Sequence, residues 1–245
     1  MTNFLTLVAA HQGMGDHILC NGLYRELKLK CRFLLIPVKN RYRRQVKRML
    51  KDTTGILILP LAEKYYWRWM RIYQLISLAF GISLVSIGSF GKDFFRVGER
   101  FDANFYYQAR IPSELRWSES PASDAVMENL LFDQLNCGDS SYIFLHEDRP
   151  RGFVIDRNLI KSPYRVIEPN PQIANRFSIF DYKKVVENAA EIHVIESSFA
   201  AFVESLEVPK VPKFAHRYAR GHAMGDFRHE FTYRANWKIL KQGGV

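Results

Sequence analysis

Short apolar runs alternate along this chain with segments whose apolar residues recur at helical spacing. The first pattern predicts buried strands, and the second predicts amphipathic helices. In the first half, the predicted strands are 4–10, 33–38, 55–61 and 82–87, and the predicted helices are 16–30, 41–51 and 63–80. This alternation indicates a parallel sheet covered on both faces, and therefore an α/β fold.

The alternation stops over residues 90–117, which are rich in aromatic residues and Arg without a clean period, and which we interpret as an irregular connector. It resumes after a helix at 122–135. The later strands are predicted at 142–146, 164–168 and 191–196, and the later helices at 180–190, 197–206 and 233–241. We therefore expect two small Rossmann-like lobes, residues 1–115 and residues 116–245.

Composition narrows the class of protein and of partner. The 245 residues are 47% hydrophobic and carry a formal net charge of +10, which is typical of a globular protein with anionic partners. Nucleotide phosphates, anionic glycans, lipid headgroups and nucleic acid all qualify. The chain has three cysteines without CxxC spacing, which favours a reduced protein without disulfides. It has no apolar run long enough to span a membrane and no leader-like start, so we expect a cytoplasmic protein.

A glycine-rich turn follows the first predicted strand. Gly13 and Gly15 would let the backbone approach a ligand closely, and Asp16 opens the next helix. Asp16 is equally well explained as a helix cap. The turn is neither a dinucleotide fingerprint, since Ile18 stands where GxGxxG needs glycine, nor a P-loop.

The run Gly13-Met14-Gly15-Asp16-His17-Ile18-Leu19, followed by Gly22-Leu23, resembles the amino-terminal motif of heptosyltransferase-type glycosyltransferases. The resemblance implies a GT-B fold, with two Rossmann-like lobes around a cleft. It also implies that Asp16 is the general base that deprotonates the acceptor hydroxyl. Gly13, Gly15 and His17 would then lie in the cleft.

A second turn joins the strand at 191–196 to the helix that follows it. Its residues Glu196, Ser197 and Ser198 could gather hydroxyls and backbone N–H groups around a phosphate. The turn is similar to the late strand–helix turn of GT-B enzymes, including heptosyltransferases and fucosyltransferases, which implies that it holds the donor's pyrophosphate or sugar. The alternative is that one of the serines only caps the helix.

Two further segments carry arginine. Arg149 and Arg151 follow the strand at 142–146 and resemble the His/Arg loop of fucosyltransferase-like proteins, which implies phosphate binding; a solvated charged loop is the alternative.

Tyr107 and Arg116 lie in the connector, which resembles connectors of glycosyltransferase-like proteins from bacterial polysaccharide clusters. They would contact the acceptor or the cleft, or else pack a hinge between the lobes.

A basic segment, 41–48, and an aromatic one, 65–71, could together face an anionic membrane. A charged run is more often a solvated face, and an aromatic helix is more often core. By composition both segments fit nucleic acid equally well, but no RRM, KH or helix-turn-helix signature accompanies them.

We predict no metal and no cofactor, because the chain has no DxD triplet and no HExxH motif, and His216, His222 and His229 lack metal-ligand spacing. The predicted function is transfer of a sugar from a nucleotide diphosphate sugar to a glycan or glycolipid acceptor, with inversion implied by the resemblance. The alternatives are a GT-B-shaped nucleotide-sugar epimerase, which could use His17 and His193, and a basic nucleic-acid-binding protein.

Overall fold

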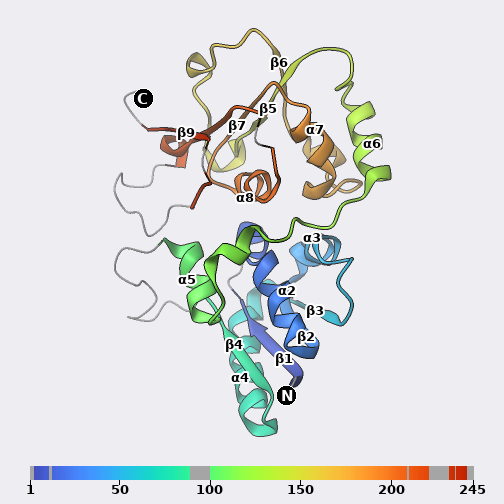
Figure 1. Ribbon diagram of the computed structural model, residues 1–245, viewed down its shortest axis with the longest axis vertical. Helices are drawn as coiled ribbons and strands as arrows, with labels where there is room; N and C mark the ends of the chain where they lie inside the picture. Colours follow the sequence, from blue (N-terminus) through green and yellow to red (C-terminus); the bar gives the residue numbers. More distant parts are fainter. Residues whose placement is uncertain are drawn as a thin grey trace. The chain divides into compact units, whose positions relative to one another are not determined.

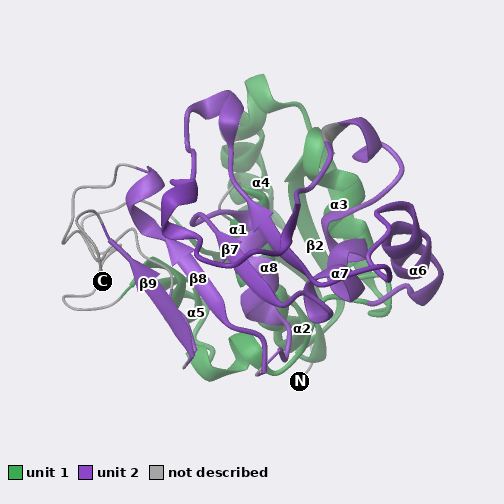
Figure 2. Ribbon diagram, turned by 90° about the horizontal axis from the view of Figure 1, so that it is seen from above, with its two compact units in different colours: residues 1–122 green, residues 123–245 purple. Residues whose placement is uncertain are grey.

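The structure is a computed structural model that describes residues 3–10, 13–88, 100–208, 210–220, 232–234 and 236–241. The chain folds into two compact units, Met1–Ala122 and Ser123–Val245 (Figures 1 and 2). The boundary predicted at 115 lies inside a 3-10 helix of the first unit, η3 (Ser113–Trp117). Each unit contains an all-parallel sheet with helices, so the predicted α/β class is confirmed.

The first unit is built on a four-stranded parallel sheet. Its strands are β1 (Asn3–Ala9), β2 (Cys31–Lys39), β3 (Ile56–Leu61) and β4 (Ser83–Ser86), in the order β3-β2-β1-β4. Central side chains such as Val8, Leu34 and Ile36 are completely buried. The strand order reverses at β1, and in open parallel sheets such a reversal brings ligand-binding turns together beyond the strands' carboxyl ends.

The helices of the first unit are α1 (Met14–Leu19), α2 (Asn21–Leu29), α3 (Arg43–Met49), α4 (Tyr66–Phe80) and α5 (Phe101–Gln108), with short 3-10 turns η1 (Asn40–Tyr42) and η2 (Glu63–Tyr65). The single helix predicted over 16–30 is in fact two helices that meet at Cys20. Tyr106 explains the break: its hydroxyl donates to the carbonyl of Leu19 at 2.9 Å and accepts from the backbone N–H of Leu23 at 3.2 Å. The Tyr106 side chain, which is distant in sequence, thus supplies hydrogen-bond partners for backbone groups that have none within the two helices.

The prediction of an irregular connector over 90–117 is wrong where the structure describes it. Residues 101–108 form α5, and residues 113–117 form η3; residues 89–99 lie outside the described residues. Because α5 buries Phe105 and Tyr106 and still leaves Tyr107 exposed, aromatic residues occur all round it. The helical period is therefore hidden in the sequence.

The second unit contains a five-stranded parallel sheet. Its strands are β5 (Tyr142–His146), β6 (Arg165–Ile167), β7 (Glu191–Val194), β8 (Lys213–His216) and β9 (Trp237–Leu240), in the order β6-β5-β7-β8-β9. Its helices are α6 (Ala125–Gln134), α7 (Lys183–Glu187) and α8 (Ser198–Ser205), with 3-10 turns η4 (Arg149–Arg151), η5 (Arg157–Leu159), η6 (Pro171–Ile173), η7 (Ile179–Tyr182) and η8 (Arg217–Arg220). The strand order again reverses, here at β5.

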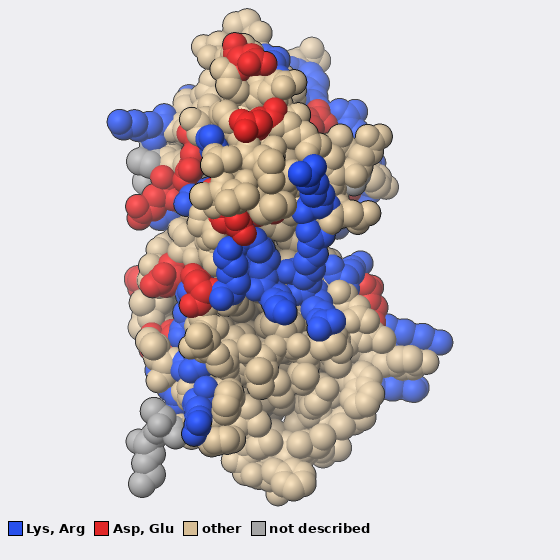
Figure 3. Space-filling view, turned by 90° about the vertical axis from the view of Figure 1, so that its right-hand side faces the viewer, with Lys and Arg blue, Asp and Glu red and all other residues tan. Residues whose placement is uncertain are grey.

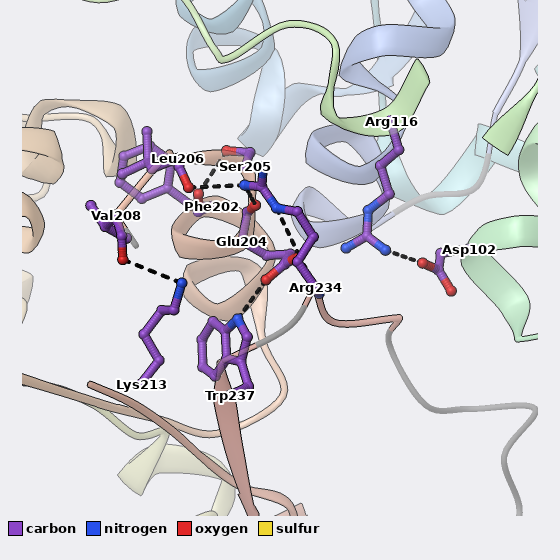
Figure 4. A network of polar contacts seen from close by, with 10 residues as sticks. All are labelled: Asp102, Arg116, Phe202, Glu204, Ser205, Leu206, Val208, Lys213, Arg234 and Trp237. Atoms are coloured by element: carbon purple, nitrogen blue, oxygen red, sulfur yellow. Dashed lines mark hydrogen bonds and ion pairs between the residues drawn. The ribbon is translucent and has the colours of Figure 1, made fainter. Parts of the chain in front are cut away.

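The last predicted helix, 233–241, is wrong: residues 237–240 form β9, which pairs in parallel with β8, a strand that the sequence did not predict. Buried Glu204 at the end of α8 fixes this tail (Figure 4). Its carboxylate accepts from the indole N–H of Trp237 at 2.5 Å and from the backbone N–H of Arg234 at 2.7 Å. The Arg234 guanidinium also donates to the carbonyl of Leu206 at 2.9 Å. Long-range contacts, not local pattern, set this strand.

Among the residues described, no helix combines the length and the apolar character needed to cross a membrane.

Candidate active site

The first part of the candidate site follows β1 in the first unit. Gly13 is extended (φ −83°, ψ 155°) and precedes α1, and its backbone N–H donates to Oδ2 of Asp16 at 2.8 Å. A Cβ on Gly13 would lie only 2.7 Å from that oxygen. Glycine at 13 therefore leaves room for the carboxylate, which sits in the first turn of the helix, where negative charge is favoured. Gly15 and Asp16 remain partly exposed.

The charge of Asp16 acts on two nearby tyrosines, Tyr24 and Tyr66. Burial, and after it the negative charge of Asp16, raises the pKa of Tyr66, whose hydroxyl donates to the carbonyl of Ala10 at 3.0 Å. His17 is completely buried, and its Nδ1 lies 2.9 Å from the hydroxyl of Tyr24. In this structure His17 thus packs in the interior of the first unit, while Asp16 keeps some contact with solvent.

Arg116 forms a buried ion pair with Asp102, drawn in Figure 4. The pair joins η3 to α5, and the guanidinium also lies 5.1 Å from the ring centre of Trp117. Tyr107, on the same helix as Asp102, is about half exposed. The ion pair of Arg116 holds two elements of the first unit together. A hinge between the lobes and a contact with an acceptor both stay predictions.

The second part of the candidate site lies at the carboxyl edge of the sheet in the second unit. Ser197 precedes α8, and its hydroxyl lies 3.1 Å from Nδ1 of His146, the last residue of β5. The imidazole packs 4.4 Å from the ring of Phe199. Burial lowers the pKa of His146 to about 4, so this imidazole is neutral at pH 7. The turns after β5 and β7 are therefore linked directly.

Glu196 is buried behind the same turn. Its Oε1 accepts from Nε of Arg217 at 3.0 Å, and the carbonyl of Glu196 accepts from Arg220 at 2.5 Å. Both arginines belong to η8, which follows β8. The sequence analysis missed them because a four-residue strand that begins with Lys213 gives no clear signal. The turn that contains Glu196, Ser197 and Ser198 is thus held by two arginines of η8, which follows the neighbouring strand β8.

The two arginines predicted to bind phosphate are paired with carboxylates. Nε of Arg149 lies 2.6 Å from Oε1 of Glu147, an almost fully buried carboxylate that also pairs with Arg157 at 3.1 Å. Nε of Arg151 donates to Asp148 at 2.5 Å. Burial of Asp148 works to raise its pKa, but the hydrogen bonds and charge of Arg151 outweigh this and lower it. Both arginine side chains are more than half exposed, so they remain accessible to a phosphate.

A hydrogen-bond chain runs from β7 to η8 behind these turns, and the carboxylate at its end sets its direction. A carboxylate can only accept, so Nε2 of neutral His193 donates to Glu191 at 3.1 Å, and Nδ1 of His193 accepts from Nε2 of His216 at 2.8 Å. Nδ1 of His216 then accepts from the Tyr218 hydroxyl at 3.0 Å, and this hydroxyl accepts from the backbone N–H of Asp156 at 2.9 Å. Both imidazoles are neutral in this arrangement.

The pKa values of His193 and His216 agree with neutral imidazoles in this hydrogen-bond chain. Burial, and then the neighbouring His193, lowers the pKa of His216 to about 3; burial also lowers that of His193, against the opposing effect of Glu191. His193, considered as an acid or base for epimerisation, is therefore part of the sheet's interior.

Within the described part of the chain, no group of three or more His, Cys, Asp or Glu side chains is arranged to hold a metal ion. His216 lies in β8, whereas His222, Asp226 and His229 lie outside the described residues.

Comparison with known proteins places the fold. No protein-family model and no curated protein sequence matches the chain. Among solved structures, it is similar to the ADP-heptose lipopolysaccharide heptosyltransferase II of E. coli, with a TM-score of 0.58 and 10% identity over 97% of this chain and 90% of that one. It is also similar to a family 9 glycosyltransferase from Veillonella parvula, with a TM-score of 0.60 and 9% identity over 98% and 88% of the two chains.

At these identities the likeness establishes the fold. The chain has the two-unit GT-B fold seen in heptosyltransferases, and the fold expected from the Gly13–Asp16 and Glu196–Ser198 turns is confirmed.

Proposed function

We propose that this chain is a glycosyltransferase that moves a sugar from a nucleotide diphosphate sugar to a glycan or glycolipid acceptor. The observation that carries the proposal is the Gly13–Asp16 turn: a partly exposed carboxylate held by a backbone N–H directly after β1 of a GT-B fold. The fold extends over nearly the whole chain, and one structure that shares it is, by its name, an ADP-heptose heptosyltransferase.

In the proposed reaction, Asp16 acts as general base. Its carboxylate accepts the proton of the acceptor hydroxyl while the hydroxyl oxygen forms a bond to the anomeric carbon of the donor sugar. The bond from that carbon to the diphosphate breaks, and its electron pair leaves with the nucleoside diphosphate. Attack from the face opposite the leaving group inverts the anomeric centre. The hydrogen bond from Gly13 orients the carboxylate for this step.

The second unit supplies the proposed donor ligands. The backbone N–H groups at the start of α8, together with the hydroxyls of Ser197 and Ser198, would bind diphosphate oxygens, because helix amino termini favour anions. Arg149 and Arg151 would add guanidinium groups as charge develops on the leaving group. We propose that these groups take the place of a metal ion. Glu196 would stay bound to Arg217 and position the turn.

The first unit would receive the acceptor, with Tyr107 and the basic face of α3 as its proposed contacts. That face presents exposed Arg43, Arg44 and Lys47, while Val46 and Met49 pack inward. Such a face suits an anionic glycan or the headgroups of an anionic membrane. We propose that the enzyme works in the cytoplasm in peripheral contact with such a membrane.

Thermal unfolding with a panel of nucleoside diphosphates tests the donor site. A ligand present at a hundredfold excess over its dissociation constant stabilises the native state by about 2.7 kcal/mol, which raises the unfolding midpoint by about 5–10 °C. Arg149→Ala should reduce this shift, whereas the matched control Arg43→Ala, an exposed arginine of the other unit, should retain it. Equal losses in both variants, or no shift with any nucleotide, would remove the donor assignment.

A further inference from the structure

Helix α4 has apolar side chains both on its packed face and on its exposed surface. Tyr66 and Met70 pack with Ala9 and Leu61 in a core cluster of the first unit. Six further apolar side chains are exposed to solvent: Trp69, Ile72, Leu75, Ile76, Leu78 and Phe80. At about 100° per residue they spread over more than half of the helix circumference. A helix with apolar residues on most of its faces is normally covered, so this exposed surface calls for a partner.

The exposure is greatest toward the carboxyl end of the helix. Leu75 is 66% exposed, Leu78 is 79% exposed and Phe80 is 77% exposed. Gly81 then turns the chain with φ 63°, which leads directly into β4. In Figure 1 this end of α4 extends beyond the sheet of the first unit. Contiguous exposed apolar residues of this size mark interaction sites.

The charged residues of α4 are all basic and lie near its amino terminus. Arg68 and Arg71 belong to its first half, and Lys64 precedes it in η2. All three side chains are exposed, and no acidic residue occurs between 64 and 82. The preceding Glu63 lies 3.1 Å from Arg41 and is paired with it. Figure 3 shows a face of the molecule whose lower part, in the first unit, includes a wide area without charged side chains. The helix thus changes along its axis from basic and aromatic to uncharged and mainly apolar.

We propose that the carboxyl-terminal end of α4 docks into the surface of an anionic lipid bilayer. Leu75, Leu78 and Phe80 enter the boundary between headgroups and acyl chains, and the three cations contact the phosphates above it. With the helix axis near the membrane normal, the rise from residue 75 to residue 80 is about 8 Å, comparable with the thickness of one headgroup region. Trp69 then lies at headgroup level, where Trp is enriched.

Two features favour a bilayer over a second copy of this chain. The patch combines a cationic rim with an apolar tip, and both suit the same anionic surface. A second copy of so basic a chain would bring like charges together. The inference rests on the membrane contact included in the proposed function, and it assigns that contact to α4 instead of to the basic helix α3 alone.

Vesicle co-sedimentation of the full chain, without nucleotide or acceptor, tests the proposal. Vesicles of phosphatidylcholine mixed with phosphatidylglycerol should bind the chain, and vesicles of phosphatidylcholine alone should bind it weakly. Leu78→Ser with Phe80→Ser should lower partitioning at least about tenfold, since two apolar side chains lose their burial. Arg68→Gln with Arg71→Gln should lower it about 30-fold at low salt and less at high salt.

A matched control replaces two other apolar residues of similar exposure. Leu29→Ser with Val126→Ser changes side chains that are 76% and 68% exposed, outside α4, and should leave vesicle binding intact. Circular dichroism checks that each variant is folded. Binding that is unaffected by both α4 variants, or equally reduced by the control, overturns the proposal, as does a dimer in sedimentation velocity that the Leu78/Phe80 variant abolishes. The donor-site assignment is tested separately, because nucleotide stabilisation should be the same in all these variants.

Discussion

Replacement of Gly22 by alanine tests the packing of α2 against η3. A Cβ at position 22 would lie 1.9 Å from the carbonyl oxygen of Leu115 and 2.9 Å from its carbonyl carbon. Carbon–oxygen contacts of this kind are normally about 3.3–3.6 Å, so the two elements must separate by more than about 1 Å. Leu115 cannot yield easily, because η3 is tied to α5 by the buried pair of Arg116 and Asp102.

The expected cost follows from opposing effects. Alanine in a helix is favoured over glycine by about 1 kcal/mol. Overpacking of a closed interface costs about 1–3 kcal/mol, and separation of α2 from α5 would also strain the two hydrogen bonds of Tyr106, each worth about 1 kcal/mol. We expect Gly22→Ala to lower the free energy of unfolding by about 2–3 kcal/mol, which lowers the midpoint by about 4–12 °C.

Thermal and urea unfolding monitored by circular dichroism measure the effect. Gly138→Ala is the matched control, because its added Cβ would meet only a ring carbon of Phe132 at 3.9 Å, and it should change the midpoint little. A Gly22→Ala variant as stable as the natural sequence would contradict the close approach of α2 and η3. The glycine in the amino-terminal motif would then need a reason other than packing.

Two further predictions concern the second unit. His146 has a pKa of about 4 in the native chain, against an ordinary value of 6.5. Between these pH values the unfolded chain binds a proton at His146 and the native chain does not, so the free energy of unfolding should fall by about 3 kcal/mol as the pH falls from 6.5 to 4. His146→Phe should flatten this pH dependence in urea titrations. An unchanged slope would contradict the buried neutral imidazole. Glu204→Gln should lower the free energy of unfolding by about 2–4 kcal/mol, because it breaks the buried ion pair with Arg234. Limited proteolysis should then cleave the variant near β9 faster than the natural chain. Equal cleavage rates would contradict the role of Glu204 in holding β9.

The strands were predictable wherever a buried run is long enough to be distinctive. β1, β2 and β5 come from such runs, because a central parallel strand is apolar on both faces. β3 is an edge strand, but it was predictable because all six of its residues are apolar. β8 and β9 are four residues each and contain Lys213 and Lys238, so no apolar run marks them. Helix α5 escaped prediction for the opposite reason, since its aromatic residues occupy several faces and hide the period.

Turns of the candidate site were predictable, and the partners of their side chains were not. Asp16 and Ser197 follow buried strands, so their place at the carboxyl edge of a sheet follows from the pattern alone. The contacts of Arg149 with Glu147, of Arg116 with Asp102 and of Ser197 with His146 join residues that only the folded chain brings together. Arg217 and Arg220 could not be assigned to the site without β8 as a strand.

Acceptor-dependent release of a nucleoside diphosphate tests the central claim most directly. The chain is incubated with a panel of nucleotide diphosphate sugars, with and without glycan and glycolipid acceptors, and the released nucleotide and the glycosylated product are quantified. We expect at least one donor to give both products in equal amounts. Asp16→Asn should cut the rate by about 10²–10⁴-fold while its nucleotide stabilisation and unfolding midpoint are retained, since an amide oxygen can still accept from Gly13. No turnover with any donor, or full activity in Asp16→Asn, would contradict the account.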